Sequence, residues 1–137
     1  MNKKIGAGLI GTAHAHAVGH LKALRASESF ELIAVAEPNE ELLTKAKKDP
    51  RWSEVNWVNV DGLLSDERVR MVCVETDPLE SLPFARRAVK AGKHVKIDKP
   101  PGADLKALEA VFKEAEMRHC VVQMGYVYRY NPAFRLA

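Results

Sequence analysis

Short apolar runs alternate along the chain with segments of helical period. The runs that predict buried strands cover residues 4–10, 30–36, 69–74, 94–97 and 121–127, and a weaker run covers 55–60. The run over 30–36 is apolar on both faces, which is typical of a central parallel strand.

The segments between these runs predict four helices. The first helix covers residues 17–26, and the second follows its cap Asn39 and runs to about residue 48. The third contains Leu82, Ala85, Ala88 and Val89 and ends at Gly92. The fourth covers residues 104–119. The last helix places Leu105, Leu108, Phe112 and Ala115 on one face. Repeated strand–helix–strand units with short connections require right-handed crossovers. The pattern therefore predicts an α/β fold with a doubly wound parallel sheet covered by helices on both faces.

Composition narrows the class of protein without naming its chemistry. The chain has 137 residues, of which 47% are hydrophobic and 28% charged, as expected of one folded domain. Its net charge of +3 comes without any block of five or six like charges, so we expect no nucleic-acid binding. No signal peptide is evident, and no stretch approaches the roughly 18 apolar residues that cross a membrane. Cys73 and Cys120 lie in apolar runs without metal-binding spacing, which favours reduced thiols in a cytoplasmic protein.

A glycine-containing turn follows the first predicted strand. Gly6 and Gly8 complete a GxGxxG pattern with Gly11, but they lie inside the strand. The phosphate-binding turn should instead begin at Gly11 and continue through Thr12, Ala13, His14, Ala15 and His16. A tight turn, a small second residue and a helix N-terminus together favour binding of a dinucleotide pyrophosphate. Ala13 stands where a second glycine is usual, so the match is degenerate.

An acidic residue ends the second predicted strand. Glu37 lies 26 residues after Gly11, somewhat beyond the usual offset of about 20 for the acid that binds the adenine ribose. A carboxylate there would repel a 2′-phosphate, and no arginine follows at once. The cofactor expected is NAD, with NADP less favoured; the alternative for Glu37 is a surface acid at a strand end.

His14, His16 and His20 raise the question of a metal. Their spacing across a turn is not a familiar ligand arrangement, and neither carboxylates nor cysteines neighbour them in the sequence. We therefore expect no metal site, and expect these imidazoles to line the cofactor pocket or to pack at the helix start.

The most distinctive stretch of the chain is AGKHVKIDKP at residues 91–100. It resembles the AGKHVxxEKP signature of the glucose–fructose oxidoreductase and inositol dehydrogenase family, called Gfo/Idh/MocA. The strand–turn–helix opening over 5–24, the strand that ends in an acid and proline over 30–38, and GYVYRYNP at 125–132 are similar to the same family. The resemblance covers nearly the whole chain and implies a Rossmann-type NAD(P)-binding domain.

The resemblance also implies roles for particular residues. The lysine of the Glu-Lys-Pro motif lies beside the nicotinamide and polarises the substrate oxygen, so Lys99 is the expected catalytic residue. Asp98 stands where the family has glutamate. The residues that the resemblance places at the cofactor are Thr76, Asp98, Lys99 and Pro100. Thr76-Asp77-Pro78 departs from the usual Thr-Pro-Asn, and Ser81 replaces a frequent histidine, which affects the expected contacts to nicotinamide.

Members of this family carry a second α/β domain that forms most of the substrate pocket and the oligomer interface. We expect residues 1–126 to form the dinucleotide-binding domain and residues 127–137 to begin the connection to that substrate domain, which this chain lacks. Asn131 and Pro132 already predict the start of another helix.

Three functions remain open at this point. The first is the cofactor domain of an oxidoreductase that moves hydride between nicotinamide and the hydroxyl or carbonyl carbon of a sugar, cyclitol or related polyol, the fragment alone being inactive. The second is a non-catalytic module that binds or senses a nucleotide. The third is a regulatory protein of the same fold that binds no dinucleotide.

Overall fold

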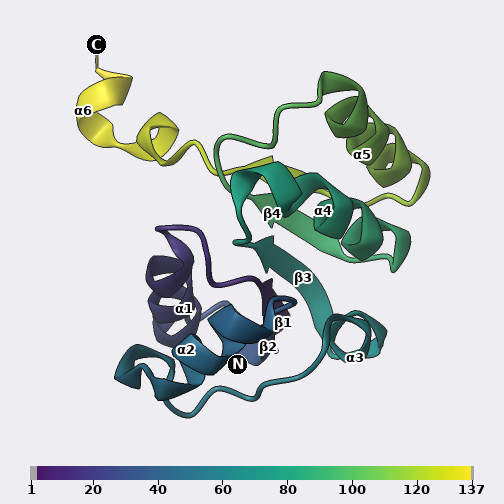
Figure 1. Ribbon diagram of the computed structural model, residues 1–137. Helices are drawn as coiled ribbons and strands as arrows, with labels where there is room; N and C mark the ends of the chain where they lie inside the picture. The colour runs from purple at the N-terminus through teal and green to yellow at the C-terminus, as the bar shows by residue number, and fades with distance from the viewer. Residues whose placement is uncertain (1–2, 137) are drawn as a thin grey trace.

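Five parallel strands form a single sheet in the computed structural model, which describes residues 3–136 (Figure 1). Their order across the sheet is β2-β1-β3-β4-β5. The strands are β1 (Ile5–Ile10), β2 (Phe30–Ala36), β3 (Val69–Val74), β4 (His94–Ile97) and β5 (Val122–Met124). This arrangement confirms the predicted doubly wound fold. Residues 1 and 2 of the expected domain over 1–126, and residue 137 of the expected connection over 127–137, lie outside the described residues.

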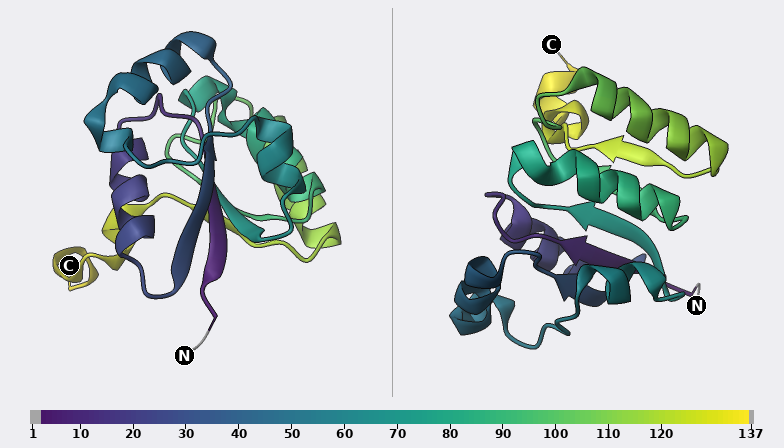
Figure 2. Two further views of the ribbon diagram at one scale, coloured as in Figure 1. Left: turned by 90° about the horizontal axis from the view of Figure 1, so that it is seen from below. Right: turned by 45° about the vertical axis from the view of Figure 1, so that its right-hand side comes forward.

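Helices cover both faces of the sheet (Figure 2). The helices are α1 (Ala17–Ala26), α2 (Glu40–Lys48), α3 (Val60–Ser65), α4 (Ser81–Lys90), α5 (Leu105–Met117) and α6 (Pro132–Arg135), with short 3-10 turns at Pro50–Trp52, Pro78–Glu80 and Val127–Tyr130. On one face, Leu9 and Val35 pack with Leu21 of α1. On the other, Ile10 and Val72 belong to a core shared with α3, α4 and α5. Alternate side chains of each strand therefore enter two separate cores. Within residues 3–136, no helix has the length and apolar character needed to cross a membrane.

Strand register brings the residues that follow the strands into one row. Ile10 pairs with Ala36 on one side and with Val74 on the other, and Val74 pairs with Ile97. The first residues beyond these strand ends are Gly11, Glu37, Glu75 and Asp98. Chain connections diverge between β1 and β3, and this switch point at the carboxyl ends of the strands is where doubly wound sheets bind ligands.

Three predictions about the elements are wrong. The strand expected over 121–127 is limited to β5, because the Tyr126 amide turns back to the Met124 carbonyl and a 3-10 turn begins at Val127. The strand expected over 55–60 is reduced to one bridge between Trp57 and Val35, because the Asn59 side chain caps α3, which begins at Val60. The predicted face of α5 is also only partly correct. Val111 and Ala115 are buried, whereas Leu105 and Phe112 are exposed, because α5 covers the edge of the sheet rather than its centre.

Candidate functional site

The loop after β1 makes a turn that requires glycine. Gly11 has a φ of +94°, and a Cβ at this position would lie 2.5 Å from the Thr76 amide nitrogen. Thr76 itself is buried, and its hydroxyl donates to the Asp77 carbonyl. The structure therefore places Thr76 against the turn, where it fixes the path of the loop.

The same loop presents unpaired amide groups at a helix N-terminus. The amides of Thr12 and His14 donate to the Glu37 carboxylate and to the Glu75 carbonyl. Within residues 3–136, the amides of Ala13 and Ala15 have no protein acceptor. Helix α1 begins at Ala17 without a side-chain cap and without an acidic residue in its first turn. These donors and the positive end of the helix dipole fit an anion such as a pyrophosphate.

Glu37 is held against this loop. One carboxylate oxygen accepts from the Thr12 amide at 2.6 Å and from the Thr12 hydroxyl at 2.7 Å, and the other accepts from the Asn39 amide at 2.9 Å. The residue is only 8% exposed. A carboxylate has about four acceptor positions, so these three bonds leave room for a further donor such as a ribose hydroxyl.

Two hollows adjoin the loop. One of 300 Å³ is lined by residues 12–15 of the loop together with Lys45 and Arg51. The second, of 360 Å³, is lined by His16, Lys99 and residues 125–128. Loop residues thus contribute to both hollows, which suits a ligand with two ends joined by an anionic centre.

Lys99 lies at the second hollow, and its backbone is fixed from two sides. Its amide donates to Asp98 Oδ1 at 2.7 Å, and its carbonyl oxygen lies 3.1 Å from His14 Nε2. Its side chain is exposed, and the following Pro100 is exposed too. The structure therefore brings the two predicted parts of the site, the turn over 11–16 and the segment over 98–100, into direct contact.

The first half of the AGKHVKIDKP stretch lies at the opposite end of β4 from Lys99, where its residues stabilise the fold. Lys93 Nζ donates to the carbonyls of Asp66 and Val69, and burial lowers the pKa of this lysine. Gly92 ends α4 with a φ of +74°. His94 Nδ1 accepts from the Val121 amide and so links β4 to β5. Residues 98–100 and the Lys96 side chain are the parts of the stretch that reach the carboxyl ends of the strands.

A cluster of charged and imidazole side chains lies behind the turn, and the sequence alone does not predict it. Glu75 and Asp98 are buried at the ends of β3 and β4. Asp98 lies within 3.8 Å of a ring nitrogen of all three histidines, and Glu75 lies within 3.6 Å of His14 and His20. No carboxylate neighbours these histidines in the sequence, and strand order is what brings Glu75 and Asp98 beside them in the fold. The one local signal for Glu75 is an acid placed directly after the apolar half of a strand, residues 71–74.

Asp98 is ionised at the centre of this cluster. Burial alone would raise its pKa, but the backbone amide of Lys99 and the ammonium of Lys96 outweigh burial and lower it below the ordinary value. Contacts with His16 and His14 act in the same direction. The Asp98 carboxylate therefore carries a negative charge beside the Lys99 backbone.

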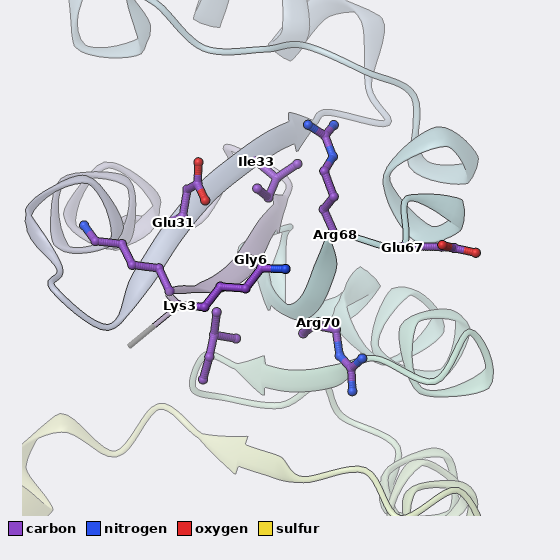
Figure 3. A pocket seen from close by; sticks show the side chains of 9 residues that line it. Lys3, Gly6, Glu31, Ile33, Glu67, Arg68 and Arg70 are labelled. Atoms are coloured by element: carbon purple, nitrogen blue, oxygen red, sulfur yellow. The ribbon is translucent and has the colours of Figure 1, made fainter. Parts of the chain in front are cut away.

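A further pocket at the amino ends of the strands does not form a comparable site. This pocket, of 470 Å³, is lined by basic residues that include Arg68 and Arg70. Figure 3 shows these two side chains extending away from each other, and Arg68 is paired with Asp66. Its charged groups do not converge, and it lies at the edge opposite to the loop over 11–16.

Comparison with known proteins agrees with this geometry. The model of a family described as "Oxidoreductase family, NAD-binding Rossmann fold" (GFO_IDH_MocA) matches residues 5–126. UDP-N-acetylglucosamine 3-dehydrogenase of Acidithiobacillus ferrooxidans is 28% identical over 93% of this chain and 39% of its own length. The uncharacterized oxidoreductase YdgJ of Escherichia coli is 32% identical over 73% of this chain and 28% of its own length.

Solved structures give the same result. KijD10, a 3-ketoreductase of Actinomadura kijaniata in complex with TDP-benzene and NADP, superposes with a TM-score of 0.83 at 26% identity, covering 98% of this chain and 42% of that one. This chain spans about a third of the length of the curated relatives that it matches. It belongs to the Gfo/Idh/MocA oxidoreductase family, whose NAD-binding Rossmann domain it forms.

Proposed function

We propose that this chain holds NAD for an oxidoreductase that acts on the hydroxyl or carbonyl carbon of a sugar, cyclitol or related polyol. A bound nicotinamide ring supplies the hydride chemistry, and the protein supplies binding and orientation. The observation that carries the proposal is the 3.1 Å contact between His14 of the phosphate-binding turn and the carbonyl of Lys99. It joins a binding element to a substrate-facing lysine at the switch point of the sheet.

In this proposal the turn over 11–16 binds the pyrophosphate. The amides of Ala13 and Ala15 and the N-terminus of α1 are its donors. The hollow lined by Lys45 and Arg51 then receives the adenosine end, and the hollow at His16 and Lys99 receives the nicotinamide end.

The preference for NAD over NADP rests on charge. The Glu37 carboxylate lies beside the turn and would repel a 2′-phosphate, whereas a ribose hydroxyl can donate to its remaining acceptor position. Arg51 in the same hollow is paired with Asp49, which offsets its attraction for a phosphate.

Lys99 is the proposed catalytic residue. Its exposed ammonium can donate a hydrogen bond to the substrate oxygen and stabilise negative charge there. Asp98 and His14 fix the backbone of this lysine, so its side chain starts from a defined position. The names of two similar proteins, a UDP-N-acetylglucosamine dehydrogenase and a 3-ketoreductase, support a substrate of the sugar class.

We also propose that residues 127–137 adjoin a substrate-binding domain in the working enzyme. This segment carries five large apolar side chains that are each more than half exposed: Val127, Tyr128, Tyr130, Phe134 and Leu136. An apolar surface of this kind is typical of a contact with another folded unit.

Calorimetric titration with NAD and NADP, followed by an oxidation assay over a panel of sugars and polyols, tests the function. We expect NAD to bind more tightly than NADP, and turnover to require Lys99 in the oxidoreductase that contains this domain. Binding of NAD without turnover of any polyol by that oxidoreductase would favour the non-catalytic nucleotide module. Absence of binding to a folded sample would contradict both.

A further inference from the structure

Four side chains converge behind the phosphate-binding turn and form what we call the histidine–carboxylate cluster: His16, His20, Glu75 and Asp98. They come from the start of α1 and from the ends of β3 and β4. Glu75 has no exposed surface, and Asp98 is 3% exposed. The proposed hydride transfer uses neither Glu75 nor His20.

Three members of the cluster, His20, Glu75 and Asp98, each offer one ligand atom, and these atoms lie within 4.8 Å of one another, as around one metal ion. His20 Nδ1 lies 2.7 Å from Glu75 Oε1 and 3.8 Å from Asp98 Oδ2, and His16 Nδ1 lies 3.0 Å from the same Asp98 oxygen. Metal bonds of about 2.0–2.2 Å place neighbouring nitrogen and oxygen ligands about 3.0–3.5 Å apart. Small side-chain rotations would bring these atoms to that separation.

Two of these buried side chains have unsatisfied atoms. Glu75 Oε2 is buried and lacks any hydrogen-bond partner within the part of the chain that the structure describes. His20 Nδ1 is also buried and makes no well-aligned hydrogen bond there, although Glu75 Oε1 lies 2.7 Å away. Oε2 lies 3.6 Å from His14 Nδ1, so it faces the histidine-containing turn beside the cluster rather than solvent. Buried polar atoms are rarely left unpaired, and a carboxylate oxygen is costly to bury alone.

Charge leads to the same conclusion. Glu75 and Asp98 bring two negative charges, and Lys96 lies 3.3 Å from an oxygen of each. One ammonium cannot balance two carboxylates, and it leaves Oε2 of Glu75 without a partner. Either protonated histidines or a bound cation must compensate the remaining charge.

We propose that the histidine–carboxylate cluster binds a divalent first-row transition-metal ion. Mixed imidazole and carboxylate donors suit Zn²⁺, Co²⁺ or Fe²⁺, whereas Mg²⁺ prefers oxygen donors alone. His14 stands outside the ligand set, because its Nδ1 accepts from the His16 amide and its Nε2 lies on the Lys99 carbonyl. It instead connects the proposed metal site to the Lys99 backbone.

Titration of the chain with Co²⁺, followed by visible absorption, and with Zn²⁺, followed by equilibrium dialysis and metal analysis, tests this site. We expect one ion per chain at micromolar concentrations and binding of Mg²⁺ at least about a hundredfold weaker. His20→Asn and Glu75→Gln should each weaken binding of Co²⁺ at least about tenfold, since each removes a ligand. The matched controls His119→Asn and Glu109→Gln alter exposed residues outside the cluster and should bind as the unaltered chain does.

The variant Lys96→Met distinguishes a metal-binding cluster from one in which ion pairs alone balance the charge. If a metal binds, loss of the competing ammonium should tighten Co²⁺ binding by about tenfold or more. Circular dichroism of each variant checks the fold. The unaltered chain and Lys96→Met retain all of the proposed ligands, so their titrations test the site even if the other variants fail to fold.

The proposal is wrong if the folded, unaltered chain binds neither ion, as expected if protonated histidines balance the charge. It is equally wrong if His20→Asn and Glu75→Gln bind Co²⁺ as tightly as their controls, or if Lys96→Met weakens binding. No nucleotide is present in these titrations, so their failure would leave the proposed cofactor site untouched.

Discussion

The amino edge and the carboxyl edge of the parallel sheet, where its strands begin and end, differ in how their polar groups are paired. At the amino edge, Lys93 is buried but donates to two carbonyls, and His94 accepts from a backbone amide. At the carboxyl edge, Glu75 Oε2 is buried without a hydrogen-bond partner, and the amides of Ala13 and Ala15 have no protein acceptor among residues 3–136. Satisfied groups stabilise a fold, whereas unsatisfied groups mark where a ligand completes the structure. The comparison therefore assigns stability to the first edge and function to the second.

The largest expected difference is between the two lysines of one sequence stretch. Lys99→Met should lower turnover of the oxidoreductase at least about a hundredfold, with a change in stability within about 0.5 kcal/mol, because this side chain is exposed. Lys93→Met should instead cost about 2 kcal/mol of stability, since two carbonyls lose their donor. Steady-state kinetics and chemical denaturation measure both. Equal effects of the two substitutions on stability would remove the distinction between the edges.

A pair of glycines with positive φ gives the next largest effect. Gly11→Ala should destabilise the chain by about 3 kcal/mol and abolish nucleotide binding, because its Cβ would lie 2.5 Å from a backbone nitrogen at a φ of +94°. Gly92→Ala, at a φ of +74° with no atom within 4 Å of the added Cβ, should cost only about 1 kcal/mol and leave binding intact. Thermal unfolding and NAD titration of both variants check this. Retained NAD affinity in Gly11→Ala would contradict the assigned role of the turn.

A smaller difference is expected between Glu37, which directly follows β2, and Glu31, which lies within β2. Glu37→Gln should weaken NAD binding about tenfold and raise the affinity for NADP relative to NAD. In the proposed site it removes the carboxylate that accepts a hydrogen bond from the ribose and repels a 2′-phosphate. Glu31 is exposed near the start of β2, so Glu31→Gln should change neither affinity. An unchanged ratio of the two affinities in Glu37→Gln would show that Glu37 does not select the cofactor.

The smallest effect concerns an exposed ion pair at the amino edge. The hydrogen bond from the Arg68 side chain lowers the pKa of Asp66 below its ordinary value of 3.8. A lowered pKa in the folded state gives a contribution to stability that is present above pH 3.8 and is lost as pH falls through the lowered value. Asp66→Asn should therefore slightly lower the melting temperature at neutral pH and slightly flatten its fall in acid. A larger loss of melting temperature than that of Lys93→Met would contradict the ranking.

Much of the fold follows from local pattern, whereas the site follows only in part. Apolar runs predict β1 to β4 closely, and Asn39 and Gly92 act at the helix ends where their chemistry predicts. By contrast, the pairing of Glu75 with His20 depends on strand order and register, to which no local pattern in either segment points. The turn at Gly11 and the lysine at Lys99 are visible in the sequence, but the contact of His14 with Lys99 is not.

Titration of the uniformly ¹⁵N-labelled chain with NADH, followed by NMR amide shifts, tests the central assignment most directly. We predict the largest shifts at the amides of Ala13 and Ala15, with further shifts at Glu37 and Lys99. Shifts confined to Gly6, Arg68 and Arg70 at the opposite edge, or no shifts at all in a folded sample, would contradict the assignment of dinucleotide binding to the carboxyl edge of the sheet.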